Sequence, residues 1–343
     1  MTTLRHYDAL VIGAGQSGTP LALALAKAGR KTALIEREHV GGSCVNVGCS
    51  PTKTMVASAR VAYLARRAGD YGVRTGPVSL DLKRVQARKN GIISRFRTSD
   101  EDLVGATKGL DLIYGEARFR DTHSVQVHLT TGGTRHLSAE TIFLNTGDRP
   151  SIPSIPGLDS VEYLDSTTIM ELRAVPEHLM ILGGGYVALE FAQMFRRFGS
   201  QVTILQRSGQ LLSREDSDVA EAVAQILRED DIDIRLQAET VHIAPESERS
   251  ITLTIRGADG ERTLSGSHLL VATGRTPNTE RLGLSAAGIP TDEHGYITSD
   301  ERLRTPVAGI YAIGDVKGGP AFTATSFDDF RIVKTNLLEG GDA

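Results

Sequence analysis

The sequence contains very little cysteine: Cys44 and Cys49 are the only two among its 343 residues. Two thiols are too few for a secreted disulfide scaffold and for the several thiolate ligands of a structural zinc site. We therefore expect neither of these classes of protein, and we expect no metal site.

An excess of basic residues is also missing. Lys and Arg total 38 and Asp and Glu total 42, so the net charge is −4. This balance gives no excess of positive charge with which the protein could bind nucleic acid or a membrane surface. No apolar run approaches the ~18 residues of a membrane helix, and the N-terminus shows no signal or transit pattern. We expect a cytoplasmic protein of about two domains, without nucleic-acid or membrane partners.

Glycine, in contrast, is abundant, and the chain repeats itself. The 36 glycines exceed the usual ~7% of residues. Residues 178–208 match residues 8–38 without a gap. Each copy reads as an apolar strand, a glycine-rich turn, a helix, a glycine and a second apolar strand. The repeated βαβ unit predicts an α/β fold with two Rossmann-like dinucleotide-binding domains, each of three layers with a parallel sheet and a β-meander.

The two glycine-rich turns have the pattern of dinucleotide fingerprints. In such a turn the first glycine permits the tight bend, the second lets a pyrophosphate approach the backbone, and the third small residue lets the helix pack closely. The N–H groups at the start of the helix then face the phosphates. The candidate positions are Gly13, Gly15 and Gly18 in the first copy and Gly183, Gly185 and Ala188 in the second. Two fingerprints predict two dinucleotide ligands.

The residue that ends the second strand differs between the copies. Glu36 stands in the first copy and Gln206 in the second. A carboxylate at this position hydrogen-bonds a ribose 2′-hydroxyl and repels a 2′-phosphate. Gln206 removes that repulsion, and Arg207 and Arg214 could pair with a phosphate. We therefore expect FAD in the first site and NADPH, in preference to NADH, in the second.

A second repeat sets the domain boundaries. Residues 125–150 and 252–277 each contain a hairpin-like turn, at 129–134 and at 257–260, followed by an apolar strand that ends in Thr-Gly. The proline-rich segment 149–158 reads as a linker. We predict a first part of the FAD domain at 1–150, an NAD(P) domain inserted at 151–274, and a return to the FAD domain at 275–343.

The two cysteines lie between the first βαβ unit and its meander. Pro51 and the residues after it predict a helix that begins just after Cys49. A thiol at a helix N-terminus has its pKa lowered by the helix dipole. Four intervening residues allow the pair to form a disulfide or a dithiol. The alternative is that both are buried structural thiols.

The segment Cys44-Val-Asn-Val-Gly-Cys49, followed by Pro51 and Lys53, closely resembles the redox centre of class I pyridine nucleotide–disulfide oxidoreductases. That family includes glutathione reductase, dihydrolipoamide dehydrogenase and mercuric reductase. The resemblance continues through both fingerprints, Ala272-Thr-Gly-Arg-Thr-Pro-Asn278 and Tyr311-Ala-Ile-Gly-Asp315, and so covers essentially the whole chain. The stretch 204–216 looks most like the mercuric reductase branch.

The resemblance implies a role for individual residues. Cys49 would be the flavin-facing thiolate and Cys44 the thiol that exchanges with the acceptor. Lys53, paired with Glu190, would lie near the flavin, and Tyr186 would cover it until the nicotinamide arrives. The alternatives are an exposed helix lysine and a tyrosine packed behind the turn. The remaining residues that the resemblance assigns to cofactors are Gly42, Ser43, Thr146, Gly147 and Asp315 for FAD and Gly274 for NAD(P). A plain surface turn is the alternative for Asp315.

The family's C-terminal interface domain has no counterpart before the chain ends at Ala343. That domain forms the homodimer and supplies a His-Glu pair to the active site. We therefore expect no dimerisation domain here, and both dimerisation and the source of the general acid stay open. The leading interpretation is a flavin-dependent NAD(P)H:disulfide oxidoreductase whose small-molecule or protein acceptor is unknown. The alternatives are a diaphorase or oxidase that uses FAD directly, and a flavin redox sensor or fragment without turnover.

Overall fold

The apolar runs of the two repeats form neighbouring parallel strands in two separate sheets. The computed structural model describes residues 4–247 and 250–343. Strand β1 (Leu4–Ile12) pairs in parallel with β2 (Thr32–Glu36), and helix α1 (Gly18–Lys27) connects the two in the sequence. Strand β7 (His178–Leu182) pairs with β8 (Gln201–Leu205) on either side of α5 (Tyr186–Phe198) in the same way. Both predicted βαβ units are present, and the fold is mixed α/β.

The chain divides into two compact units. The first consists of residues up to 49, 93–149 and 276–343, and the second of 50–92 and 150–275. The predicted boundaries after residues 150 and 274 lie within one residue of these divisions. Residues 50–92, which we placed in the first domain, group with the second unit because Met55, Ala59, Leu82 and Val85 join its apolar core.

The sheet of the first unit combines five parallel strands with a meander. The strands that complete it are β3 (Leu110–Phe119), β4 (Ser124–Leu129), β5 (Thr134–Leu144) and β15 (Ile310–Ala312). Strands β3, β2, β1, β5 and β15 run parallel in that order, while β4 pairs antiparallel with β3 and β5. The turn predicted at residues 129–134 joins β4 to β5.

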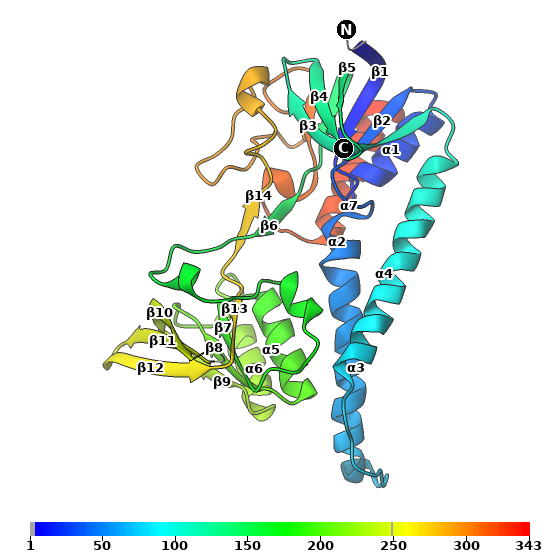
Figure 1. Cartoon of the computed structure of the whole chain (residues 1–343). Coiled ribbons are helices and arrows are strands. Elements are labelled where there is room, and N and C mark those ends of the chain that lie inside the picture. The colour runs from blue at the N-terminus through cyan, green and yellow to red at the C-terminus, as the bar shows by residue number, and fades with distance from the viewer. Residues whose placement is uncertain (1–3, 248–249) are drawn as a thin grey trace. The chain divides into compact units, whose positions relative to one another are not determined.

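Both faces of this sheet are buried, which explains why its central strands are continuous apolar runs. Helices α1 and α7 (Thr323–Leu338) lie along one face (Figure 1), where Leu21 and Val333 pack with Val11. On the other face Leu282 and Leu284 pack with Leu10. The short helix α2 (Gly42–Asn46) follows β2.

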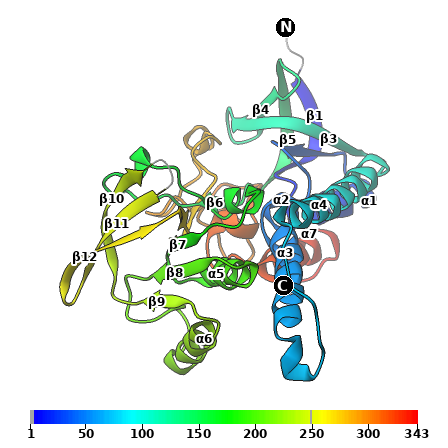
Figure 2. The same ribbon diagram turned by 60° about the horizontal axis from the view of Figure 1, so that its bottom comes forward.

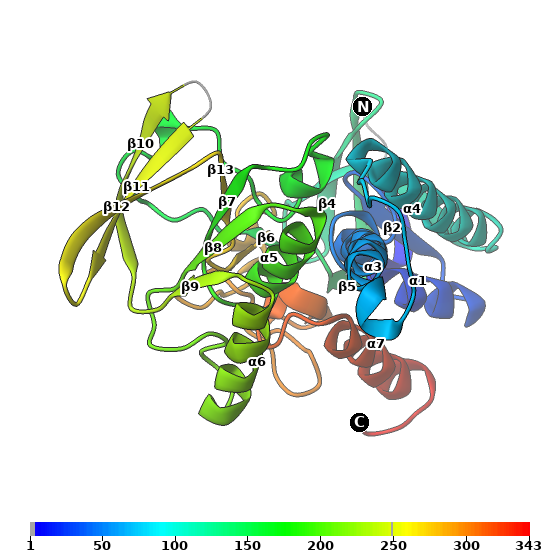
Figure 3. The same ribbon diagram turned by 90° about the horizontal axis from the view of Figure 1, so that it is seen from below.

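The second unit holds a smaller parallel sheet and a separate antiparallel one. The parallel strands are β13 (His268–Val271), β7, β8 and β9 (Asp233–Arg235), in that order. Helices α5 and α6 (Ser217–Glu229) lie beside β8 and β9 (Figure 3). Figure 2 shows the antiparallel sheet of β10 (Glu239–Ser247), β11 (Ser250–Gly257) and β12 (Gly260–Gly266), which shares an apolar core with the parallel strands. The predicted turn at 257–260 joins β11 to β12.

The remaining elements include two long helices, α3 (Cys49–Arg66) and α4 (Leu82–Gly105). They also include two short strands that pair with each other, β6 (Asp148–Pro150) and β14 (Arg275–Pro277). The helix predicted to begin just after Cys49 begins at Cys49 itself. Across residues 4–247 and 250–343, none of the helices has the length and apolar character that crossing a bilayer requires.

Candidate functional site

The first glycine-rich turn brings three backbone segments into close contact. Gly13 follows β1 with φ of +104°, and a Cβ there would lie 2.2 Å from the Asn145 carbonyl oxygen. A Cβ on Gly18 would lie 2.1 Å from the Gly13 carbonyl oxygen. Only glycine fits either position. The Asn145 amide nitrogen donates to the Gly13 carbonyl at 3.0 Å, which fixes the turn against the end of β5.

Residues at the start of α2 pack against this turn. Gly42 has φ of +61°, and a Cβ on it would lie 2.6 Å from the Gly15 Cα. The side chain of Ser43, the next residue, is exposed. The fingerprint therefore packs directly against the segment that leads to the cysteines.

Glu36 lies at the end of β2, as the sequence predicted, and its carboxylate faces the turn. One carboxylate oxygen accepts the Ala14 N–H at 2.8 Å, and the other accepts the Glu38 N–H at 2.8 Å. A carboxylate has about four acceptor positions. The two backbone bonds orient Glu36 and leave acceptor capacity for a ribose hydroxyl.

The other residues assigned to FAD lie in two turns of the same unit. The Thr146 hydroxyl donates to the Asn278 carbonyl, and the Asn278 amide donates to the Thr146 carbonyl, each at 2.9 Å. The Asn278 N–H donates to the carbonyl of Gly147 at 2.9 Å. Asp315 lies in a half-buried 3₁₀ turn, Gly314–Lys317, that follows β15. These turns lie beyond the carboxyl ends of β5 and β15, the edge where open parallel sheets bind ligands.

The two cysteines form a contacting pair. Cys44 lies half-buried in α2, and Cys49 is the exposed first residue of α3. The Cys49 side chain hydrogen-bonds Cys44, and this contact, together with burial, raises the pKa of the Cys44 thiol. The Cys49 sulfur also lies 3.3 Å from the Thr323 hydroxyl of α7. Two sulfurs in contact at a helix N-terminus can exchange between a disulfide and a dithiol.

The second glycine-rich turn repeats the first geometry in the second unit. Gly183 has φ of +110°, and a Cβ there would lie 2.3 Å from the Ala272 carbonyl oxygen. Gly185 caps α5, and a Cβ there would meet no atom within 4 Å. Ala188 is fully buried in α5, and Gly274 has φ of +144°. The space beside Gly185, at the N-terminus of α5, is therefore open, as a phosphate site requires.

Tyr186 is the first residue of α5 and is 47% exposed, so it does not pack behind the turn. Its hydroxyl donates to the Glu215 carboxylate, which raises the pKa of the phenol. The ring lies at the surface of the second unit, at the start of the helix that follows the fingerprint.

Gln206 directly follows β8 and is 9% exposed. Its amide nitrogen donates to the Ser208 hydroxyl at 3.1 Å and to the Gln210 carbonyl at 3.3 Å. Arg207 and Arg214 lie exposed in the loop that follows, and neither forms an ion pair with another of the described residues. This end of β8 carries two available guanidinium groups where the end of β2 carries Glu36.

Lys53 of α3 forms an ion pair with Glu190 of α5, and both partners belong to the second unit. Both side chains are substantially exposed, so the pair adds little to stability. The structure thus brings together the lysine and the glutamate that the resemblance assigns to one function.

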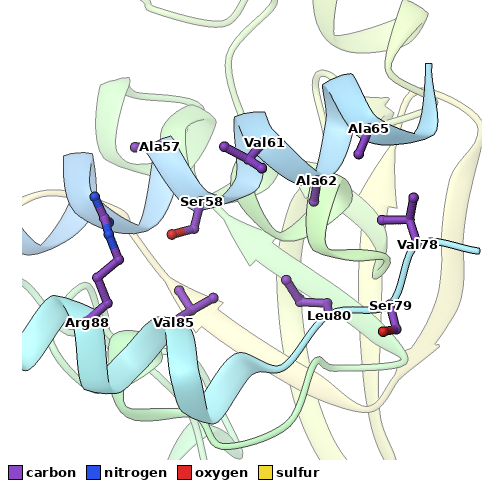
Figure 4. A pocket seen from close by; sticks show the side chains of 10 residues that line it. All are labelled: Ala57, Ser58, Val61, Ala62, Ala65, Val78, Ser79, Leu80, Val85 and Arg88. Atoms are coloured by element: carbon purple, nitrogen blue, oxygen red, sulfur yellow. The ribbon is translucent and has the colours of Figure 1, made fainter. Parts of the chain in front are cut away.

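One hollow of the second unit contains none of the predicted residues. This groove has a volume of about 340 Å³. Figure 4 shows it between α3, the segment that leads into α4 and the start of α4. Its lining is Ala57, Ser58, Val61, Ala62, Ala65, Val78, Ser79, Leu80, Val85 and Arg88. The Arg88 guanidinium donates to the Thr54 carbonyl at 2.9 Å. The groove offers small apolar surface and no acid–base pair or nucleophile beyond two hydroxyls.

Sequence reasoning missed three residues that support the site. Asn145 and Asn278 tie the turns of the first unit together, and Thr323 contacts the cysteine pair. Asn145 stands one residue before the Thr-Gly end of its strand, where the second copy has Ala272, and this difference was the available signal. No group of three or more His, Cys, Asp or Glu side chains within the described ranges could hold a metal ion.

Comparisons with known proteins agree with this geometry. The sequence pattern of the family described as pyridine nucleotide-disulphide oxidoreductase matches residues 7–329. A mercuric reductase of Streptomyces lividans is 38% identical over 98% of this chain and 71% of its own length. The probable pyridine nucleotide-disulfide oxidoreductase RclA of Escherichia coli is 39% identical over 98% of this chain and 72% of its own length.

A solved structure of the HOCl-induced flavoprotein disulfide reductase RclA from Escherichia coli has a TM-score of 0.87. The two chains are 38% identical, and the match covers 98% of this chain and 72% of the RclA chain. The chain is therefore a flavin-dependent oxidoreductase. More specifically, it belongs to the pyridine nucleotide–disulfide oxidoreductase family, whose activity uses FAD and a pyridine nucleotide.

Proposed function

We propose that the enzyme uses NADPH and FAD to reduce the Cys44–Cys49 disulfide, and that the resulting dithiol reduces a disulfide acceptor. The observation that carries the proposal is the contact between the Cys49 side chain and Cys44 in the unit that contains the first fingerprint. The bound flavin would supply the hydride chemistry and pass the electron pair on.

The residues of the first unit fit FAD. Neither Gly13 nor Gly18 can carry a Cβ, so the turn stays tight, as a pyrophosphate-binding fingerprint requires. Glu36 would accept a hydroxyl of the adenosine ribose. Gly42, Ser43, Thr146 and Gly147 would border the flavin, and Asp315 would hydrogen-bond its ribityl chain. In the second unit, Lys53 with Glu190 would lie near the flavin ring, and Tyr186 would cover it until the nicotinamide arrives.

The exchange with the acceptor balances in two steps. Cys44, once deprotonated, attacks the acceptor disulfide, forms a mixed disulfide and releases the first thiol. The Cys49 thiolate then attacks the Cys44 sulfur, which releases the second acceptor thiol and restores the Cys44–Cys49 disulfide. The acceptor gains two electrons and two protons, and the cysteine pair loses the same.

Anaerobic titration of the flavin-containing protein with NADPH tests this proposal. We expect the flavin absorbance to fall and a long-wavelength thiolate-to-flavin charge-transfer band to rise. Bleaching without that band would show that electrons do not reach the cysteine pair and would favour a diaphorase or oxidase. If NADPH causes no bleaching, the result would instead favour a flavin redox sensor without turnover.

Arg207 and Arg214 are proposed to favour NADPH because the end of β8 lacks a carboxylate. We predict that Arg214→Ala raises the KM for NADPH by about tenfold, the value of one lost charge-assisted bond of roughly 1.4 kcal/mol. The KM for NADH should change by less than twofold. Arg207→Ala should act in the same direction. Steady-state kinetics with both nucleotides measure the effect.

Arg228→Ala is the matched control, because Arg228 is an exposed arginine of α6 that pairs with Glu221 at 2.7 Å. It should leave both KM values unchanged. A wild-type preference for NADH, or equal losses with both nucleotides in Arg214→Ala, would overturn the assignment of NADPH.

A mercuric ion is a second candidate acceptor. The observation in its favour is the 38% identity to the mercuric reductase of Streptomyces lividans over nearly the whole chain. NADPH oxidation that depends on added mercuric ion, and that does not occur with disulfides, would support it over a disulfide acceptor.

A further inference from the structure

Thr323 lies far from the cysteines in the sequence but contacts them in the fold. Its hydroxyl oxygen is 3.3 Å from the Cys49 sulfur, a contact across 274 positions of the chain. Thr323 is the first residue of α7, a helix of 16 residues, so the N-terminal end of that helix faces the sulfur. All these residues belong to the first unit.

Buried polar contacts hold this end of α7 in place. The hydroxyl of Ser326 lies 2.7 Å from that of Ser17, in the first glycine-rich turn. Asp329, only 4% exposed, accepts the Gly314 N–H at 2.7 Å and pairs with Lys317 at 3.4 Å. Because α7 is fixed to both turns, the Thr323 hydroxyl has little freedom to leave the cysteine pair.

The reduced pair has to distribute one negative charge between two sulfurs. A hydroxyl can donate a hydrogen bond to a thiolate, and hydrogen bonds to a charged group favour the charged form. Cys44 from α2 and Thr323 from α7 both face Cys49. The Cys49 contact and burial raise the pKa of Cys44, and a weaker hydrogen bond between Thr323 and Cys44 opposes this rise only in part. Cys44 therefore keeps its proton more readily than an ordinary thiol.

We propose that Thr323 is a further catalytic residue, whose hydroxyl donates a hydrogen bond to Cys49 and thereby places the negative charge of the reduced pair on that sulfur. The Cys49 proton passes to solvent, and Thr323 keeps its own. The inference rests on the proposed function, because that function requires Cys49 to be the flavin-facing thiolate. Thr323 thus keeps the thiolate on Cys49, the flavin-facing cysteine, and Cys44 stays available for the acceptor.

Thiol titration tests the contact without any electron transfer. In Cys44→Ser protein, Cys49 is the only thiol of the chain, and its ionisation can be followed by thiolate absorbance in the flavin-containing protein. We expect Thr323→Val in this background to raise the midpoint by about one pH unit or more, because a hydrogen bond to a charged group is lost. Thr323→Ser should restore the lower midpoint. If the valine variant does not fold, Thr323→Ala provides the same comparison.

The charge-transfer band of the reduced protein then tests which sulfur carries the charge when both are present. In flavin-containing protein reduced by dithiothreitol, the pH at which the long-wavelength thiolate-to-flavin band appears should rise by about one unit in Thr323→Val. Thr325→Val is the matched control, since Thr325 lies half-buried on the same helix two residues away.

An unchanged midpoint in Thr323→Val, or an equal shift in Thr325→Val, overturns the role of Thr323. Neither result depends on NADPH or an acceptor. A protein that shows the midpoint shift but no charge-transfer band would contradict the proposed function and leave the thiol contact established.

Discussion

Cys49→Ser should retain bound flavin and lose disulfide-reducing turnover by about a thousandfold or more, the scale expected when a nucleophile that acts as part of a unit is removed. Serine cannot form a disulfide with Cys44, so no dithiol can be regenerated. Its hydroxyl can still hydrogen-bond Thr323, which lies 3.3 Å from the native sulfur, so the first unit should fold as before. NADPH oxidation with a model disulfide, measured beside the flavin spectrum, gives both quantities.

Two comparisons separate this effect from general damage. Reduction of a small dye should stay within about twofold of wild type in Cys49→Ser, because that reaction does not need the cysteine pair. Cys44→Ser should lose disulfide turnover to the same extent and keep the Cys49 thiolate, so it should show a charge-transfer band that Cys49→Ser lacks. Disulfide turnover near the wild-type rate in either variant would remove the cysteine pair from the electron path.

Much of the fold could be predicted because the informative contacts are local. A strand, a tight turn and a helix lie within about thirty residues in a βαβ unit, and the glycine requirement at Gly13 and Gly183 follows from the turn itself. The helix start at Cys49 could also be predicted, because Pro51 favours the first turn of a helix. The ion pair between Lys53 and Glu190 came from the family resemblance and not from any local pattern.

The unpredicted features depend on packing between distant segments. Thr323 is one of several hydroxyl residues near the start of α7, and no periodicity indicates which of them meets a sulfur 274 positions away. Residues 50–92 follow the first βαβ unit in the chain, so the sequence favoured the first domain for them. Their apolar faces instead complete the core that contains Phe191 and Phe195 of α5.

The two fingerprints allow the two nucleotide sites to be tested separately. Gly13→Ala should abolish stable flavin binding, because its Cβ would lie 2.2 Å from the Asn145 carbonyl oxygen and the turn would have to move. Gly183→Ala, whose Cβ would lie 2.3 Å from the Ala272 carbonyl oxygen, should retain flavin and raise the KM for NADPH. We expect at least about a tenfold loss at the affected site, equivalent to roughly 1.4 kcal/mol. Flavin content after gel filtration and NADPH kinetics distinguish the two variants.

Gly29 and Gly199 provide the controls, because they occupy matching positions in the two repeats and also have positive φ, +82° and +121°. A Cβ at either position would meet no atom within 4 Å. Alanine there carries the backbone strain without the collision, so Gly29→Ala and Gly199→Ala should keep both nucleotides. If Gly183→Ala loses flavin and Gly13→Ala keeps it, the two sites are assigned in the wrong order. Equal losses in the control variants would mean that backbone strain, and not the closed turn, governs nucleotide binding.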